Sequence, residues 1–126
     1  MPIVLQTDRP QDLTILTASG EITFAEAMEA LDSFYENPTQ NVLLDVSRRA
    51  DAPVILKTED LARIFSRLSA RKKNRLSGKT AIVAPDDLRF YMSRIAEAFA
   101  EIEKLPWKMK AFRSKDEAIR WLTSGE

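Results

Sequence analysis

The hydrophobic positions of this chain fall into short blocks, and each block has the spacing of one kind of secondary structure. PIVLQ and LTILTA are strand-like, and TDRPQD between them has turn residues, which together predict an N-terminal β-hairpin. NVLLDV and KTAIVA are continuous apolar runs, typical of strands covered on both faces. WKMKAF alternates between polar and apolar positions, as an edge strand does. Together these blocks predict one sheet of four or five strands.

The segments between these strands have apolar residues at helical spacing. The first runs from Thr23 to Asn37, where Thr23 and Glu26 form a capping box and Asn37-Pro38 stops the helix. Its apolar face comprises Phe24, Ala27, Met28, Leu31, Phe34 and Tyr35. The second helix runs from about Thr58 to Lys72, with an apolar face of Leu61, Ile64, Phe65 and Leu68.

Two further helices complete the pattern. Asp86 is placed to cap the third helix, and Ser114 with Glu117 forms a second capping box before the short closing helix EAIRWL. The predicted inner stripe of the third helix comprises Leu88, Met92, Ile95, Phe99 and Ile102. The order is strand, strand, helix and then strand–helix three times. It predicts a single α/β domain over residues 1–126, with a largely parallel sheet and four helices.

The composition narrows the chemistry that such a domain can perform. Histidine and cysteine are both absent, which excludes Ser-His-Asp and Cys-His nucleophiles, Cys/His zinc sites and disulfides. The three glycines form neither a dinucleotide-binding nor a Walker phosphate loop. Catalysis would need carboxylates that converge with lysine or tyrosine, so it ranks below a binding role. We expect no cofactor and no metal.

Charge is balanced overall but segregated along the chain. Residues 11–45 contain seven acidic residues and no Lys or Arg, whereas residues 61–85 contain seven basic residues and no Asp or Glu. Within the basic segment, Arg63, Arg67 and Arg71 lie four residues apart and form one ridge of the second helix. The ridge is either a solvated helix face or a surface for an acidic protein or lipid. Nucleic acid is disfavoured because net basicity and interleaved aromatic residues are lacking.

Other features have both a structural and a functional explanation. Asp86-Asp87 follows the carboxyl end of a strand, where acids could hold Mg²⁺, but helix capping explains both residues. Core packing explains Trp107 and Trp121 better than an exposed aromatic patch does. No apolar run reaches the roughly 18 residues of a membrane span. The start MPIVLQTDRP lacks the features of a signal peptide, so we expect a cytoplasmic protein without a transmembrane segment.

The order of motifs resembles that of STAS domains. DLTILTASGEITFAEAMEALDSF is similar to their start, where a strand ends in a Gly-Glu-hydrophobic step, and KAFRSKDEAIRWL resembles their closing strand and helix. NVLLDVS is similar to their central strand, which ends in an aspartate, here Asp45. GKTAIVAPDDLRFYMSRIAEAF resembles uncharacterised bacterial SpoIIAA-like proteins, whose aromatic-x-x-x-Arg-x-x-Glu pattern corresponds to Phe90, Arg94 and Glu97.

The resemblance implies a SpoIIAA-like/STAS fold and non-catalytic regulation through protein–protein contacts, as in anti-sigma factor antagonists. In those proteins a kinase phosphorylates a serine within an Asp-Ser-Ser/Thr-Gly motif at the start of the second helix. The matching region VILKTEDLARIF lacks that motif and offers Thr58 as its one hydroxyl at the helix start. A role as helix N-cap already explains Thr58, and Glu59-Asp60 would repel an added phosphate.

Two functions remain as hypotheses. The first is a regulatory or scaffold domain that docks another protein, or a second copy of itself, through Ser47, Arg48, Arg49 and the ridge Arg63, Arg67 and Arg71. A dimer that joins the acidic first helix to the basic second helix would weaken with salt. The second is a carrier for a lipid or small apolar metabolite, because the same superhelical fold class includes the CRAL-TRIO lipid-transfer domains. That function needs an apolar cavity, which periodicity cannot distinguish from a packed core.

Overall fold

The computed structural model describes residues 3–19, 22–47, 57–71, 75 and 77–124. In chain order its elements are β1 (Ile3–Asp8), the 3-10 turn η1 (Arg9–Gln11), β2 (Leu13–Ala18), α1 (Phe24–Glu36), β3 (Asn41–Asp45), α2 (Thr58–Ala70), β4 (Lys79–Val83), α3 (Asp87–Ile102), β5 (Lys108–Phe112) and α4 (Lys115–Thr123). The predicted succession of strands and helices is confirmed.

The strands form one five-stranded sheet in the order β1-β2-β3-β4-β5. β1 pairs antiparallel with β2 as the predicted hairpin, and every later pairing is parallel. The register places Leu16, Leu44 and Ile82 side by side across β2, β3 and β4. Because each parallel crossover carries a helix, the sheet acquires helices on its faces, as predicted for this class of α/β domain.

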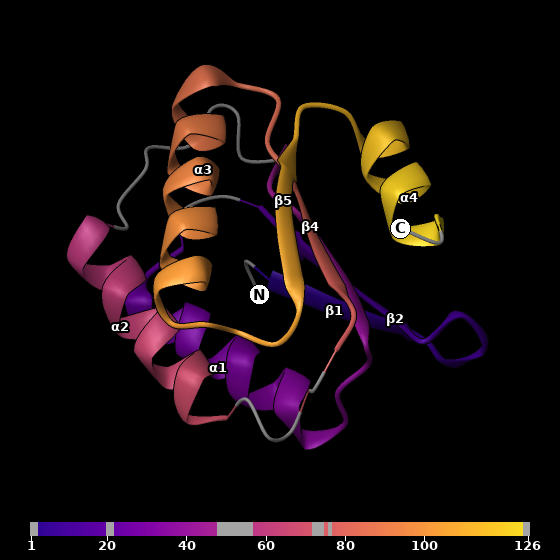
Figure 1. The fold of residues 1–126 in the computed structure, drawn as a ribbon, viewed down its shortest axis with the longest axis horizontal. Helices are drawn as coiled ribbons and strands as arrows, with labels where there is room; N and C mark the ends of the chain where they lie inside the picture. The colour runs from indigo at the N-terminus through magenta and orange to yellow at the C-terminus, as the bar shows by residue number, and fades with distance from the viewer. Residues whose placement is uncertain (1–2, 20–21, 48–56, 72–74, 76, 125–126) are drawn as a thin grey trace.

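The helices divide between the two faces of the sheet, with α1, α2 and α3 on one face and α4 on the other (Figure 1). The core under α1–α3 comprises Phe34, Tyr35, Val42, Phe65, Leu68, Ile82, Ala96, Ala100 and Trp107. The core under α4 comprises Leu43, Ala81, Val83, Phe112, Ala118 and Leu122, with Trp121 packed against it. Both tryptophans therefore belong to core packing, as predicted.

Three of the predicted helix starts have the expected caps. The Thr23 hydroxyl accepts the Glu26 amide while the Glu26 carboxylate accepts the Thr23 amide, which completes the capping box of α1. Asp86 accepts the Arg89 amide at the start of α3, and Ser114 accepts the Glu117 amide at the start of α4. The predicted capping box of α4 is therefore confirmed in its first half only, since no bond joins the Glu117 carboxylate to the Ser114 amide.

The predicted N-cap of α2 is wrong. Thr58 is the first residue of the helix, and the cap position is Lys57, whose amide donates to the Asp60 carboxylate at 2.9 Å. The Asp60 carboxylate therefore stabilises the start of the helix. The Thr58 side chain takes no part in this cap and is exposed.

The predicted inner stripe of α3 is also wrong in part. Leu88 and Ile102 are 56% and 71% exposed, and the buried residues are Arg89, Ser93, Ala96 and Ala100. Small side chains at this face let the helix backbone approach the sheet closely. Arg89 tolerates burial because its guanidinium lies 3.3 Å from the Asp86 carboxylate.

Candidate functional site

A cavity of about 230 Å³ lies between the sheet and the helices α1 and α2. We call it the interlayer cavity. Its lining is almost wholly apolar and includes Leu16, Ala27, Leu31, Leu44, Leu61 and Ile64. Among the lining residues that the structure describes, nitrogen- or oxygen-bearing side chains occur only at Tyr35, Arg75, Thr80 and Trp107. The sequence could not distinguish this cavity from a filled core, because the same apolar periodicity serves both.

Arg75 is the charged residue of this lining and is only 3% exposed. Its guanidinium donates to the Gln40 carbonyl from Nε (3.1 Å) and Nη2 (2.7 Å), to the Lys79 carbonyl from Nη2 (3.0 Å), and to Thr80 Oγ1 from Nη1 (2.8 Å). All of these acceptors are neutral. Burial lowers the pKa of Arg75 to about 10, against the opposing effects of Tyr35 and Asp12.

Two aromatic residues with polar atoms lie beside this guanidinium. The central carbon of the guanidinium lies 4.6 Å from the centroid of the Trp107 ring and 5.8 Å from the centroid of the Phe34 ring. The Phe34 ring packs edge-on against the Tyr35 ring, with 5.0 Å between their centroids. Tyr35 Oη and Trp107 Nε1 are both buried and have no hydrogen-bond partner within the described part of the chain. Burial raises the pKa of Tyr35, while the nearby Arg75 and Arg71 charges oppose the rise. We refer to Tyr35, Arg75 and Trp107 as the Arg75 cluster.

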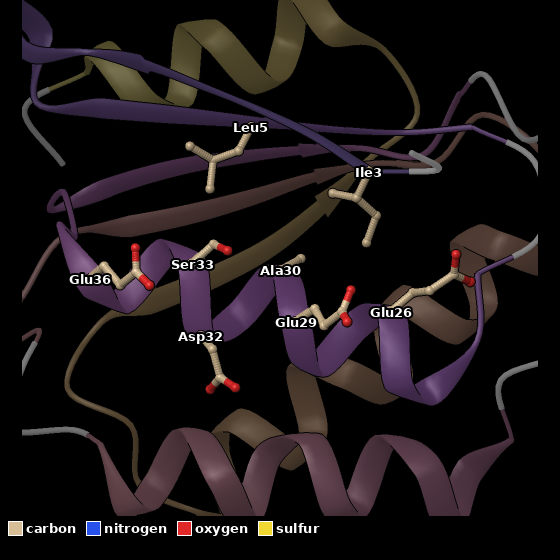
Figure 2. Close-up of a pocket in the computed structure, with 8 residues that line it drawn as sticks. All are labelled: Ile3, Leu5, Glu26, Glu29, Ala30, Asp32, Ser33 and Glu36. Carbon is tan, nitrogen blue, oxygen red and sulfur yellow. The ribbon is translucent and has the colours of Figure 1, made fainter.

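A second concave surface, the β1–α1 groove, has a volume of about 440 Å³ and lies between the edge strand β1 and helix α1. Figure 2 shows Ile3 and Leu5 pointing from β1 toward α1, where Ala30 and Ser33 face them. The lining also includes the acidic residues Glu26, Glu29, Asp32 and Glu36, of which Asp32 directs its carboxylate toward α2. The groove therefore combines apolar side chains with negative charge beside a strand that pairs only with β2 in the described sheet.

The residues predicted to dock a partner at the end of β3 are placed only in part. Ser47 donates its amide, at 2.9 Å, and its hydroxyl to the carboxylate of the buried Asp45. This contact closes the turn after β3 and uses the hydroxyl within the chain. Arg48 and Arg49 lie outside the described residues.

The predicted basic ridge of α2 contacts α1 of the same chain. Arg63 lies over the Phe24 ring at 5.0 Å, and Arg71 lies over the Tyr35 ring at 5.5 Å. Arg67 and Arg71 both reach the Asp32 carboxylate, at 3.7 and 2.7 Å. The acidic and basic segments therefore meet within one chain, which accounts for the charge complementarity on which the predicted homodimer rested.

The motif residues of α3 contact the edge strand β5 and the loop that follows it. The Glu97 carboxylate accepts the Ala111 amide at 2.9 Å and lies 3.6 Å from Arg94, whose side chain is 64% exposed. Phe90 lies under the guanidinium of Arg113, at 4.4 Å. These contacts hold α3 against β5, so the structure gives the motif a role in packing.

Each residue of the acidic pair after β4 makes a contact within the fold. Asp86 caps α3, and Asp87 lies 2.8 Å from the guanidinium of Arg113. Within the described ranges, no group of three or more acidic residues is arranged to hold a metal ion. A search of the same ranges for a helix long and apolar enough to cross a membrane finds none.

The sequence does not reveal the Arg75 cluster. Arg75 belongs to a run of basic residues typical of a solvated surface, and Tyr35 falls on the predicted apolar face of a helix. Trp107 is the one signal in the sequence, since a core position is predicted for it. Nothing local showed that this ring would lie against a buried guanidinium.

No family model matches the chain, and no curated protein matches it. Among solved structures, the chain is similar to an uncharacterised protein from the DUF3478 family of Shewanella loihica PV-4, described as having a SpoIIAA-like fold. The two share 20% sequence identity, and the match covers 95% of this chain and 91% of that one with a TM-score of 0.57. At this identity the likeness establishes the fold alone. The chain has a SpoIIAA-like α/β fold, as its motifs predicted.

Proposed function

We propose that this chain is a non-catalytic domain that binds a small apolar molecule in the interlayer cavity. The observation that supports the proposal is the cavity itself, about 230 Å³ in volume and lined almost wholly by apolar side chains. Protein cores seldom leave voids larger than a water molecule. An apolar cavity of roughly 150 Å³ is large enough to hold benzene.

The cavity is open to solvent on one side, so either water or a ligand fills it. Water is a poor filling for a lining with so few polar atoms. An apolar ligand would restore the missing contacts and stabilise the folded state by mass action.

Native mass spectrometry of the purified chain and calorimetric titration with 1-octanol test this function. Ala27→Leu, which adds volume at the lining, should weaken octanol binding at least about tenfold. Ala25→Leu is the matched control, because Ala25 is exposed on the same helix and does not line the cavity. If no ligand co-purified and octanol bound neither wild type nor control, the proposal would fail.

A second candidate is the regulatory docking domain implied by the STAS resemblance. The β1–α1 groove favours it, since apolar side chains and carboxylates lie together beside an edge strand. Such a surface suits a basic amphipathic segment of a partner protein. In this hypothesis residues 1–126 act as one cytoplasmic domain. The predicted docking residues of α2, Arg63, Arg67 and Arg71, form a second surface on which a partner could bind.

A pull-down that compares two double variants distinguishes these surfaces. Glu29→Lys/Glu36→Lys reverses the charge of the groove, and Arg63→Glu/Arg67→Glu reverses that of the α2 ridge. Loss of a partner from one variant alone assigns docking to that surface. Retention of every partner by both variants counts against docking through either.

A further inference from the structure

Arg75 presents a buried positive charge that no carboxylate of the described residues neutralises by an ion pair. The guanidinium is 3% exposed, and its four hydrogen bonds go to two backbone carbonyls and one hydroxyl. The Asp12 carboxylate raises the pKa of Arg75 through its charge, but it accepts the Gln40 amide and lies beyond ion-pair distance from the guanidinium. Buried charges in proteins are normally paired, because desolvation without an opposite charge is costly.

The same cluster contains two further donors without acceptors. Trp107 Nε1 can only donate, and Tyr35 Oη donates when neutral. Neither atom has a partner within the described part of the chain, although Trp107 and Tyr35 are only 4% and 8% exposed. A buried donor left without an acceptor carries the full cost of its desolvation.

The three groups belong to one neighbourhood. The Arg75 guanidinium lies 4.6 Å from the centre of the Trp107 ring and 5.8 Å from that of Phe34, and Tyr35 packs against Phe34 at 5.0 Å. All three residues of the Arg75 cluster line the interlayer cavity, and the other described residues of its lining are apolar apart from Thr80. Thr80 already accepts a hydrogen bond from Arg75 Nη1. The cluster is therefore a group of donors, one of them cationic, beside an apolar space.

We infer that the ligand of the interlayer cavity is a small amphiphile with a carboxylate head group, held by Arg75, Tyr35 and Trp107. This inference rests on the proposed function and names the class of its ligand. A carboxylate supplies the missing negative charge together with several acceptor sites, and its tail fills the apolar space. A neutral alcohol would fill the same space and leave the Arg75 charge unpaired.

The structural alternative is that Arg75 serves only to tie β4 to the chain around Gln40. Its hydrogen bonds to the Gln40 and Lys79 carbonyls and to the Thr80 hydroxyl show this structural role. These acceptors are neutral, so they leave the positive charge of the guanidinium uncompensated. Nη1 carries a second hydrogen, for which the described residues provide no acceptor. This role also leaves the two aromatic donors without an acceptor in the part of the chain that the structure describes.

Calorimetric titration of the full chain with octanoate and with 1-octanol tests the inference, because the two probes share one tail. Octanoate should bind at least about tenfold more tightly than octanol, as expected for hydrogen bonds to a charged group. Arg75→Met should abolish this preference, so that octanoate binds no more tightly than octanol does. Arg67→Met, which removes a half-exposed charge from α2, should keep the preference and serves as the control.

Two milder variants keep the test valid if Arg75→Met fails to fold. Tyr35→Phe and Trp107→Phe each remove one donor and keep an aromatic ring, and each should lower the ratio of octanoate affinity to octanol affinity several-fold. Equal affinity for both probes, unchanged in these variants, would overturn the carboxylate assignment and leave the proposed function standing. Binding of neither probe would overturn both.

Discussion

The carboxylate of Asp32 in α1 lies 2.7 Å from Nη2 of Arg71, the residue that follows the last turn of α2. Arg67, one turn earlier, approaches the same carboxylate at 3.7 Å. Figure 2 shows Asp32 pointing away from the β1–α1 groove toward the neighbouring helix. This contact joins the two helices that cover the interlayer cavity, and it uses the charges expected to dock a partner.

Asp32→Asn should therefore destabilise the monomer slightly. All three side chains are between 31% and 47% exposed, so solvent screens the interaction and we expect a loss of about 0.5 kcal/mol. Urea unfolding at low and high salt measures it, and the difference from wild type should shrink as salt rises. Glu29→Gln is the control, since Glu29 has no ion pair within the described residues. An equal loss of unfolding free energy in Asp32→Asn and Glu29→Gln would contradict a stabilising ion pair between α1 and α2.

The start of α2 depends on Asp60 rather than on Thr58. Asp60→Ala should lower the free energy of unfolding by about 1 kcal/mol, because the carboxylate that accepts the Lys57 amide is lost. Thr58→Ala should change it by less than about 0.5 kcal/mol, as for an exposed residue without a special contact. Urea denaturation of both variants decides between them. A larger effect at Thr58 would restore the capping role first predicted for it.

Glu97 should stabilise the free edge of β5. Glu97→Ala removes the acceptor of the Ala111 amide, and we expect a loss of about 1–2 kcal/mol with faster hydrogen exchange at that amide. Glu97→Gln retains an acceptor oxygen and should lose less. Arg94→Ala, which removes only an exposed ion pair, should leave both measurements nearly unchanged. Unaltered exchange at Ala111 in Glu97→Ala would show that this hydrogen bond is absent in solution.

Gly78 occupies a position that other residues fit poorly. Its φ is +104°, and a Cβ there would lie 1.8 Å from the Gln40 carbonyl oxygen, the same atom that Arg75 binds. Gly78→Ala should cost about 2 kcal/mol or more, since both the backbone conformation and the contact are strained. Ser77→Ala, an exposed neighbour, provides the comparison in thermal unfolding. Equal melting temperatures for the two variants would refute the expectation.

Tyr35 should make stability fall at high pH. Burial raises its pKa above the ordinary value of 10.0, outweighing the Arg75 and Arg71 charges. Above pH 10 the unfolded tyrosine therefore ionises before the folded one, so the contribution present below that pH is lost as pH rises through the folded pKa. Absorbance titration should show a late phenol step that Tyr35→Phe removes. Tyr91→Phe, at an exposed position, should retain it.

The order of elements was predictable because it depends on local information. Three of the four predicted N-cap residues, Thr23, Asp86 and Ser114, occupy their cap positions. These capping signals and the turn chemistry of the hairpin act over a few residues, so their effect on the backbone is visible in the sequence. The rotation of α3 was not predictable in the same way. Leucine and isoleucine at helical spacing suggested its inner face, yet the sheet selected Ser93, Ala96 and Ala100 because only small residues allow close approach.

The sequence alone determined that this chain has no histidine or cysteine chemistry, that it forms an α/β domain and that its motifs follow the SpoIIAA-like order. Only the tertiary structure decided which charges are paired and which are buried. Asp32 and Arg71 meet across two helices, and Arg75 becomes enclosed between Phe34 and Trp107, residues more than thirty positions away on either side. Burial and charge pairing depend on contacts between residues distant in the chain, and local spacing does not contain that information.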